Sequence, residues 1–287
     1  MTQIAVVTDT DASLPSELAE EYEIYQVPIT VHFGEEVLRS GEDITDREMF
    51  ARIEREGVLP TTAAPSPGDF ARAYQQARDD GAEEVVCLTV SSEVSATYQA
   101  ALSARDLIPE VQVTVVDSWS VSMGQGFMAL EAAEMARRGS SVEEITARAQ
   151  DIRAHTRLYA ALDTLKYMVM SGRVGHITAG MANFLDIKPI LTIQDGKLDL
   201  LEKVRTRKKA WKKILDLSRD DLNDGGEIKR IFILHVDAPE EAGAFEVLLR
   251  EVLGYNGVIP HAELSPGLSV HTGSGVVGTA FLMAGEV

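Results

Sequence analysis

Short apolar runs alternate with amphipathic stretches along the first half of the chain. Runs of strand length occur at 4–7, 27–31, 85–90 and 111–116. The segments between them have the spacing of apolar and polar residues that is typical of helices. Alternation of this kind predicts a parallel sheet with helices packed on it, so the N-terminal part is expected to be an α/β domain.

Three helix starts are marked in the sequence. Thr45 and Ser141 are each followed three residues later by a glutamate, and Ser66 is followed directly by Pro67. A hydroxyl with a glutamate at that spacing can satisfy two backbone donors reciprocally, and proline at the first helical position loses no hydrogen bond. Helices are therefore predicted to begin just after Thr45, Ser66 and Ser141.

The second half of the chain has a different pattern of apolar runs. It predicts a second α/β unit with strands at 158–162, 188–193, 231–236 and 276–283, and helices at 206–222 and 239–253. A length of 287 residues is typical of about two domains. We expect the first domain to cover 1–160 and the second 161–287.

Composition places the chain among acidic globular proteins. It is 45% hydrophobic and 25% charged, with a formal net charge of −18, which excludes a disordered tail or a collagen-like chain. A net negative charge repels phosphate backbones, so nucleic acid is not expected as a partner.

From the sequence we expect neither secretion nor a membrane span. The N-terminus lacks a basic segment followed by an apolar one, and nowhere do about 18 apolar residues follow one another. The single cysteine, Cys87, lies in an apolar run and is expected to pack as a small buried side chain. A reducing, cytoplasmic location is expected.

Several catalytic and cofactor motifs are absent or incomplete. The six histidines have no zinc-site spacing, so no metal site is expected. The string at 273–278 has the G-x-G-x-x-G form, but nine residues after it are too few for a nucleotide-binding βαβ unit. This string is instead expected to form a tight turn, and the missing phosphate-loop motif argues against an intrinsic ATPase.

Three loops rich in hydroxyl groups lie beside predicted strands, at 8–13, 60–67 and 91–98. Helix capping alone explains each loop. Taken together, they place neutral donors and helix N-termini where α/β proteins usually bind ligands, and this suits an anionic head such as a carboxylate or a phosphate.

The same loops contain the residue types of a nucleophilic enzyme. Ser92, Ser95, Asp117 and His271 are candidates for a triad, although the G-x-S-x-G motif is missing. A hydrolase or acyltransferase with Ser95 as nucleophile and His271 as base therefore stays open as an alternative function.

Several motifs, in order along the chain, resemble those of the bacterial DegV family. The matching segments are 4–10, 61–66, 91–99, 117–118, 171–174, 188–191, 203–206 and 271–275, and the likeness extends over 3–285. The chain departs from the family pattern at Ala96, where glycine is usual, and at Ala63 and Ala64, where Ser-Gln is usual. Neither change removes a residue that is expected to bind the ligand.

The resemblance implies a parallel-sheet domain and a mixed-sheet α/β domain, with a long-chain fatty acid such as palmitate or oleate between them. It implies a carrier that is not itself an enzyme, needs no cofactor and presents the acid to a separate fatty acid kinase. Thr62 and Ser95 would bind the carboxylate, and His271, Arg173 and Ser92 would support them. A regulatory module that senses lipid would use the same pocket.

Two segments are candidates for lining the acyl tail, 123–128 and 181–185, because methionine adapts to irregular apolar ligands. A core helix explains these segments equally well.

Seven basic residues gather in a short stretch of this acidic chain: Lys203, Arg205, Arg207, Lys208, Lys209, Lys212 and Lys213. This cluster is either a solvated helix face or a docking surface for an acidic kinase or, transiently, for anionic lipid headgroups. Arg205 and Arg207 are the residues expected to dock a partner.

Overall fold

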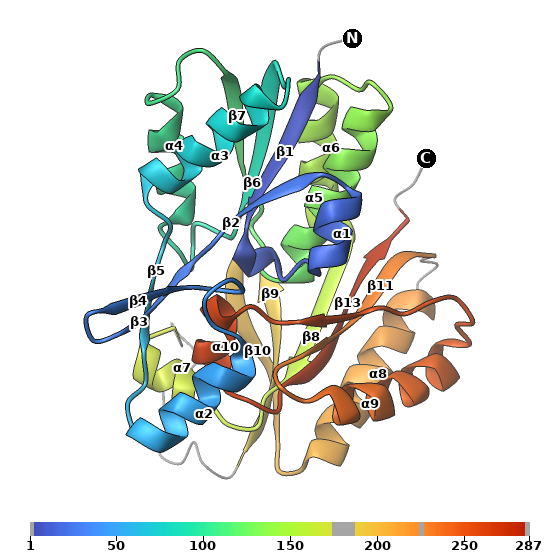
Figure 1. Cartoon of the computed structure of the whole chain (residues 1–287). Coiled ribbons are helices and arrows are strands. Elements are labelled where there is room, and N and C mark those ends of the chain that lie inside the picture. The colour runs from blue at the N-terminus through green and yellow to red at the C-terminus, as the bar shows by residue number, and fades with distance from the viewer. Residues whose placement is uncertain (1–2, 174–186, 224–226, 285–287) are drawn as a thin grey trace.

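The computed structural model describes residues 3–173, 187–223 and 227–284. The N-terminal part contains a parallel four-stranded sheet in the order β2-β1-β6-β7 (Figure 1). Its strands are β1 (Ile4–Asp9), β2 (Ile24–Val27), β6 (Glu84–Thr89) and β7 (Gln112–Asp117). The predicted parallel sheet is therefore confirmed.

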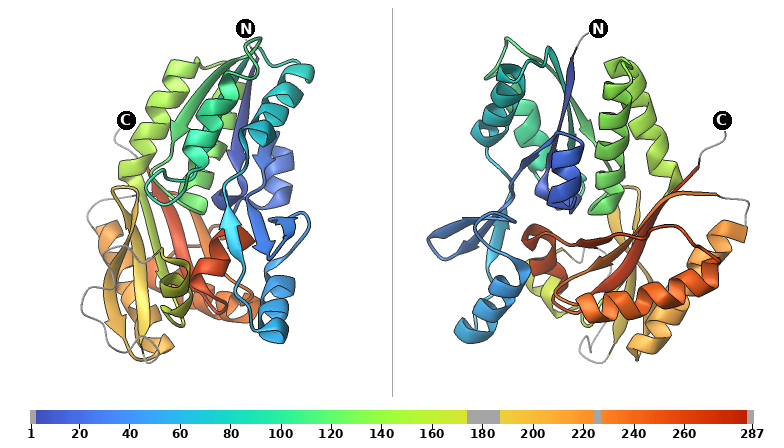
Figure 2. Two further views of the ribbon diagram at one scale, coloured as in Figure 1. Left: turned by 90° about the vertical axis from the view of Figure 1, so that its left-hand side faces the viewer. Right: turned by 45° about the vertical axis from the view of Figure 1, so that its right-hand side comes forward.

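Helices cover both faces of this sheet. Figure 2 shows α3 (Pro67–Asp79) and α4 (Thr97–Arg105) on one side, and α5 (Met123–Arg137) and α6 (Val142–His155) on the other. Side chains alternate along β6, so Val86 packs with α5 and Cys87 packs with α3 and α4. A strand buried on both faces requires a continuous apolar run. Cys87 is fully buried, as expected.

The predicted single strand at 27–31 is wrong. Strand β2 ends at Val27, and β3 (Thr30–Phe33) belongs to a separate antiparallel sheet with β4 (Glu36–Arg39) and β5 (Thr61–Ala63). Pro28 lies between the two strands and has no N–H to continue a ladder. This change of sheet, with α2 (Asp46–Glu56) between β4 and β5, carries the chain toward the C-terminal part.

The C-terminal part contains a mixed six-stranded sheet in the order β10-β9-β8-β13-β11-β12. Only the β11–β12 pair is parallel among these described strands. The strands are β8 (Thr156–Ala161), β9 (Lys188–Gln194), β10 (Lys197–Val204), β11 (Ile228–His235), β12 (His261–Glu263) and β13 (Val277–Met283). The mixed sheet is confirmed, and the predicted domain boundary at residue 160 falls within β8.

The two faces of the mixed sheet have different neighbours. Helices α8 (Arg207–Asn223) and α9 (Pro239–Leu253) cover one face, close to the predicted bounds (Figure 1). The other face packs against α5, where the Phe127 and Phe232 ring centroids lie 5.9 Å apart. The two large sheets therefore share one hydrophobic core.

Short elements connect these layers: η1 (Thr10–Ala12), α1 (Ser16–Glu21), α7 (Lys166–Ser171) and α10 (Pro266–Thr272). The three predicted helix starts are confirmed, since Thr45, Ser66 and Ser141 each form a capping box. The glycine string after α10 forms the predicted turn. Gly273 has φ +84°, and a Cβ there would lie 2.5 Å from the Tyr167 ring, so only glycine fits.

Candidate functional site

A cavity of about 450 Å³ opens where loops of the N-terminal sheet meet the mixed sheet and α10. It brings together residues of all three hydroxyl-rich loops, and all five head-group residues predicted from the sequence line it. The polar lining residues are Asp11, Thr62, Ser92, Glu93, Ser95, Ser122, Arg173, His271 and Thr272. Most of the remaining lining is aliphatic.

Thr62 is held at the cavity by the small sheet. Its strand β5 pairs with β3, with Thr62 opposite Val31. The Thr62 Oγ1 and His271 Nε2 atoms lie 3.0 Å apart in a hydrogen bond, although the two residues are 209 positions apart in sequence. This contact joins β5 to α10.

His271 is held neutral. Burial lowers the pKa of His271 to about 4, and the nearby positive charge of Arg173 acts in the same direction. Its Nδ1 atom is buried and has no hydrogen-bond partner among the described residues. The imidazole is therefore a neutral hydrogen-bonding group at physiological pH.

Ser95 lies just before the N-terminus of α4. Its Oγ is 2.8 Å from Thr97 Oγ1 and accepts a hydrogen bond from the Thr97 N–H at 3.3 Å. Helix α4 has no side-chain cap from Ala96, which also lines the cavity. The hydroxyl of Ser95 is thus placed beside a helix N-terminus, where anions are favoured.

Ser92 and Arg173 lie at the exposed rim of the cavity. The Ser92 N–H donates to Asp117 Oδ1 at 3.2 Å, which fixes the loop. Arg173 donates from Nη1 to the carbonyl of Ser171 at 2.6 Å. The rim therefore carries one fixed positive charge near the Thr62–His271 pair.

The residues proposed for a nucleophilic triad do not assemble into one. Asp117 Oδ1 accepts hydrogen bonds from the backbone N–H groups of Ser92 and Trp119. Ser95 bonds to Thr97, whereas His271 bonds to Thr62. A triad needs a base bonded to its nucleophile and oriented by an acid, so the geometry does not support the hydrolase alternative.

The apolar part of the cavity comes mainly from the mixed sheet and α10. Its large side chains include Leu158, Leu162, Met168, Leu191, Leu198, Leu234, Leu264 and Leu268. The predicted tail segment at 123–128 is instead the buried start of α5, and the cavity lining does not include it among the described residues. The other predicted tail segment, 181–185, lies outside the described residues.

Sequence reasoning missed four polar lining residues: Asp11, Glu93, Ser122 and Thr272. Asp11 was visible only as part of the loop at 8–13, and nothing in the sequence marked Ser122 as different from other serines. Ser122 has φ +51° and a buried Oγ without a partner among the described residues. Burial and the charge of Asp9 raise the pKa of Asp11 to about 8.

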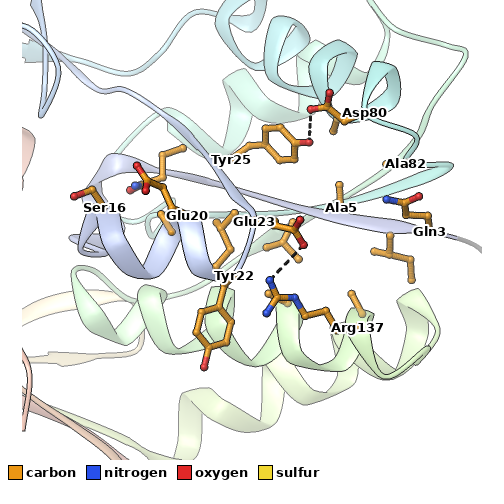
Figure 3. Close-up of a pocket in the computed structure, with 18 residues that line it drawn as sticks. Gln3, Ala5, Ser16, Glu20, Tyr22, Glu23, Tyr25, Asp80, Ala82 and Arg137 are labelled. Carbon is orange, nitrogen blue, oxygen red and sulfur yellow. Dashed lines mark hydrogen bonds and ion pairs between the residues drawn. The ribbon is translucent and has the colours of Figure 1, made fainter. Parts of the chain in front are cut away.

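A larger hollow of about 790 Å³ lies elsewhere, at the edge strand β2. Figure 3 shows its polar walls, in which Tyr25 points toward Asp80 and Arg137 points toward Glu23. The Tyr25 hydroxyl donates to Asp80 at 2.7 Å. None of the three hydroxyl-rich loops reaches this hollow among the described residues, so the smaller cavity is the better candidate site.

The seven basic residues between 203 and 213, here called the basic surface, lie on the end of β10, in the bend that follows it and on the first turns of α8. Arg207 bonds to Asp163 at 2.9 Å and Glu241 at 3.0 Å, so it also holds α8 in place. The side chains of Lys203, Arg205, Lys208 and Lys209 are exposed.

Within 3–173, 187–223 and 227–284, no helix is long and apolar enough to cross a bilayer. In the same ranges, no group of three or more histidine, cysteine or acidic residues is placed to hold a metal ion.

A family model described as "Uncharacterised protein, DegV family" matches residues 3–284. The chain belongs to the DegV family. A DegV domain-containing protein of Streptomyces coelicolor is 35% identical over 275 residues, which cover 96% of each chain. Another, from Caldanaerobacter subterraneus, is 32% identical over 98% of this chain and 99% of the relative.

Solved structures of DegV proteins have the same fold. A DegV family protein from Thermus thermophilus, described with fatty acid binding, has a TM-score of 0.87 at 32% identity and covers 99% of this chain and 100% of its own. DegV of Bacillus subtilis, described as a fatty acid binding protein, has a TM-score of 0.89 at 28% identity with the same coverage. The two-domain DegV architecture expected from the sequence is therefore confirmed.

Proposed function

We propose that the protein binds a long-chain fatty acid in the cavity of about 450 Å³ and presents it to a separate fatty acid kinase. The observation that carries this proposal is one cavity with a hydroxyl-rich end and aliphatic walls. Two DegV relatives with the same fold are described as fatty acid binding.

The carboxylate accepts hydrogen bonds from Thr62 and Ser95. A neutral His271 donates from Nε2–H to Thr62 Oγ1, which leaves the threonine proton for the carboxylate. Arg173 and Ser92 support the head group from the rim. Neutral hydroxyl donors hold the carboxylate less tightly than a bidentate arginine, so it stays reactive toward a phosphoryl donor.

The acyl chain lies along the aliphatic walls. Removing each CH₂ group from water contributes about 0.8 kcal/mol, so the tail supplies most of the affinity and the head group sets the orientation. The protein itself performs no chemistry. The kinase forms the acyl phosphate with ATP, which places both proteins in the cytoplasm.

The kinase docks on the basic surface in this proposal, with Arg205 and Arg207 as contact residues. A partner with an acidic face complements this patch of an otherwise acidic protein. Anionic membrane lipids are the competing occupant, and the docking experiment distinguishes the two.

The first experiment is native mass spectrometry of the purified protein, followed by lipid extraction. The expected result is one free fatty acid per chain that is lost on denaturation. Protein that arrives empty and takes up neither palmitate nor oleate would contradict the proposal.

Thr62→Val tests the head group, because valine keeps the shape of threonine and removes its hydroxyl. We expect fatty acid affinity to fall about tenfold, since the carboxylate loses a charge-assisted hydrogen bond. Ser95→Ala should act similarly. Thr61→Val is the matched control, because Thr61 is the exposed neighbour outside the cavity. Equal affinities for the Thr62 and Thr61 variants would rule out the assigned role.

Arg205→Glu tests docking with loaded protein. We expect acyl phosphate formation by the kinase to slow while fatty acid affinity stays unchanged, because Arg205 lies outside the cavity. Arg105→Glu, a charge reversal at the end of α4, is the control. If Arg205→Glu instead weakens only binding to anionic vesicles, the basic surface contacts membranes and not the kinase.

A further inference from the structure

A second space of about 320 Å³, here called the outer chamber, adjoins the cavity of the candidate site. Its described lining comes from the loop after β7, from α5 and α6, and from β8, β9 and the turn after β9. Among the described residues, Leu158 of β8 is the one that lines both the cavity and the outer chamber. The side chain of Leu158 therefore faces the cavity on one side and the outer chamber on the other.

The register of β8 and β9 gives the order of the two spaces. Ala160 of β8 pairs with Leu191 of β9, and both line the cavity. Two residues toward the start of β8 and the end of β9, a step of about 7 Å, the same register places Leu158 opposite Ile193. Ile193 lines the outer chamber, and so does Thr156, which is one further step along β8. The two spaces are therefore successive stretches along the same pair of strands, with Leu158 between them.

The facing wall changes from the cavity to the outer chamber in the same order. In the loop after β7, Val121 and Ser122 line the cavity, whereas Trp119 and Ser120 line the outer chamber. Trp119 is 44% exposed, and the Arg153 guanidinium lies 5.2 Å from the centroid of its ring. The outer chamber therefore extends from Leu158 to the protein surface at Trp119.

Leu158 is a fixed part of the wall. It is 7% exposed, belongs to the hydrophobic core shared by the two large sheets and pairs with Ala280 of β13. Side chains in such a core are closely packed, so a ligand cannot displace Leu158 without a cost in packing. Removal of most of this side chain would join the two spaces.

The outer chamber could accept a short apolar segment. Met128 and Ile193 are apolar and pack in the same core as Leu158, and methionine adapts to irregular ligands. The other side chains of its lining are more polar: Ser120, Gln150, Arg153, Thr156 and Asp195. The apolar part therefore suits a few methylene groups, and the polar part does not favour a longer stretch of hydrocarbon.

The methyl end of the ligand is the end that can reach this wall. The head-group residues Thr62, Ser95 and His271 line the cavity and are not among the described residues that line the outer chamber. A carboxylate held by these residues leaves the methyl end free to extend along β8. Leu158 is thus placed to contact the end of the acyl chain.

We propose that Leu158 is the stop that sets the longest acyl chain the protein binds, and that the outer chamber is a subsite for the last carbons of longer chains that this side chain closes off. This inference rests on the proposed function. Each CH₂ group that enters the cavity adds to the affinity until the methyl end meets Leu158. Further groups must stay in water or strain the packed core.

The test measures the preferred chain length by competition. Delipidated full-length protein receives an equimolar mixture of the even-numbered saturated acids from myristate to lignocerate as cyclodextrin complexes, and native mass spectrometry identifies the bound acid. For the unmodified protein, we expect affinity to rise about 15-fold with each two-carbon step up to a limit and then to stop rising. In Leu158→Ala, the rise should continue for at least one more step.

Leu162→Ala is the matched control. Leu162 follows β8, is buried in the same core and lines the cavity, but it is not among the described residues that line the outer chamber. This variant widens the cavity without joining it to the outer chamber, so its limit should equal that of the unmodified protein. Leu158→Val is a milder truncation that guards against a folding defect, and it should shift the limit in the same direction as Leu158→Ala.

A double variant locates the additional carbons. Ile193→Phe in the Leu158→Ala background places a larger side chain in the outer chamber. We expect it to return the limit to that of the unmodified protein. A limit that stays long in the double variant would show that the additional carbons lie elsewhere, and would overturn the subsite.

The remaining outcomes separate this inference from the carrier function. An unchanged limit in both Leu158 variants, an equal shift in Leu162→Ala, or an unmodified protein with no limit within the series would overturn the role of Leu158 and leave the carrier function intact. Failure of the unmodified protein to bind any acid of the series would overturn the carrier function itself.

Discussion

At the scale of single residues, three aspartates are buried where ionisation is costly. Burial raises the pKa of Asp9 to about 6, and raises the pKa values of Asp11 and Asp46 to about 8. Asp46 also lies near the charges of Glu263 and Asp237, which act in the same direction. It accepts a hydrogen bond from Ser269, which joins α2 to α10.

Asp46→Asn should flatten the pH dependence of stability. The folded state keeps the Asp46 proton up to about pH 8, whereas the unfolded chain loses it near pH 4. The stabilisation that comes from the protonated Asp46 is therefore complete below the pKa of Asp46 in the unfolded chain. It is lost as the pH rises through the pKa of Asp46 in the folded state. We expect the free energy of unfolding of the unmodified protein to fall, relative to the variant, by about 1.4 kcal/mol per pH unit between these limits.

Urea unfolding at a series of pH values measures this slope. Asp43→Asn is the control, because hydrogen bonds from Arg39 lower the pKa of the exposed Asp43. Removal of that carboxylate should leave the slope between pH 5 and 8 unchanged. Parallel stability curves for the unmodified protein and Asp46→Asn would show that Asp46 is ionised in the folded state.

At the scale of elements, the helices on the N-terminal sheet depend on caps and on one buried face. Helix α6 begins at a capping box between Ser141 and Glu144, and it buries Ile145 and Ile152 in the core. The cap fixes where the helix starts, and the apolar face fixes how it rotates against α5.

Ser141→Ala should lower the free energy of unfolding by about 1 kcal/mol, because the first-turn N–H groups lose their side-chain partner. Thermal or urea unfolding measures the loss. Ser140→Ala provides the comparison, since Ser140 precedes the cap and is not part of it. A loss of the same size in both variants would show that the cap itself does not stabilise α6.

At the scale of the whole molecule, an ion-pair network joins α5, which covers the N-terminal sheet, to β11 of the mixed sheet. Glu131 on α5 is 5% exposed and bonds to Lys229 and Arg230 of β11, and Arg230 also bonds to Glu134. These cations hold the pKa of Glu131 below its usual range despite its burial. The network lies along the shared core that positions the cavity walls.

Glu131→Gln should destabilise the protein by about 2–3 kcal/mol. This is less than the loss for a fully buried pair, because the cations keep partial access to solvent. The loss should appear as one cooperative shift of the unfolding curve, since the two sheets share a core. Glu23→Gln, which removes an exposed partner of Arg137, should change stability by less than about 1 kcal/mol. Equal shifts in the two variants would contradict the role of the network.

Local signals in the sequence predicted most elements of the fold. Apolar runs marked β1, β6 and β7, and hydroxyl caps marked the starts of α2, α3 and α6. The predictions failed where strands pair with segments that are far away in the sequence. The run at 27–31 was divided between two sheets at Pro28, and the hairpin partner β10 went unpredicted because half-buried edge strands have weak patterns.

Which segments become strands and helices, and which loops carry hydroxyl groups, can be read from the sequence, because these features depend on neighbouring residues. Which of the hydroxyl groups meet depends on the packing of segments that are far apart along the chain. Thr62 reaches His271 across 209 positions through the pairing of β3 with β5 and the packing of α10. The neutral state of His271, the raised pKa of Asp11 and the unpaired hydroxyl of Ser122 likewise follow from burial in a medium of low polarity, which packing alone creates.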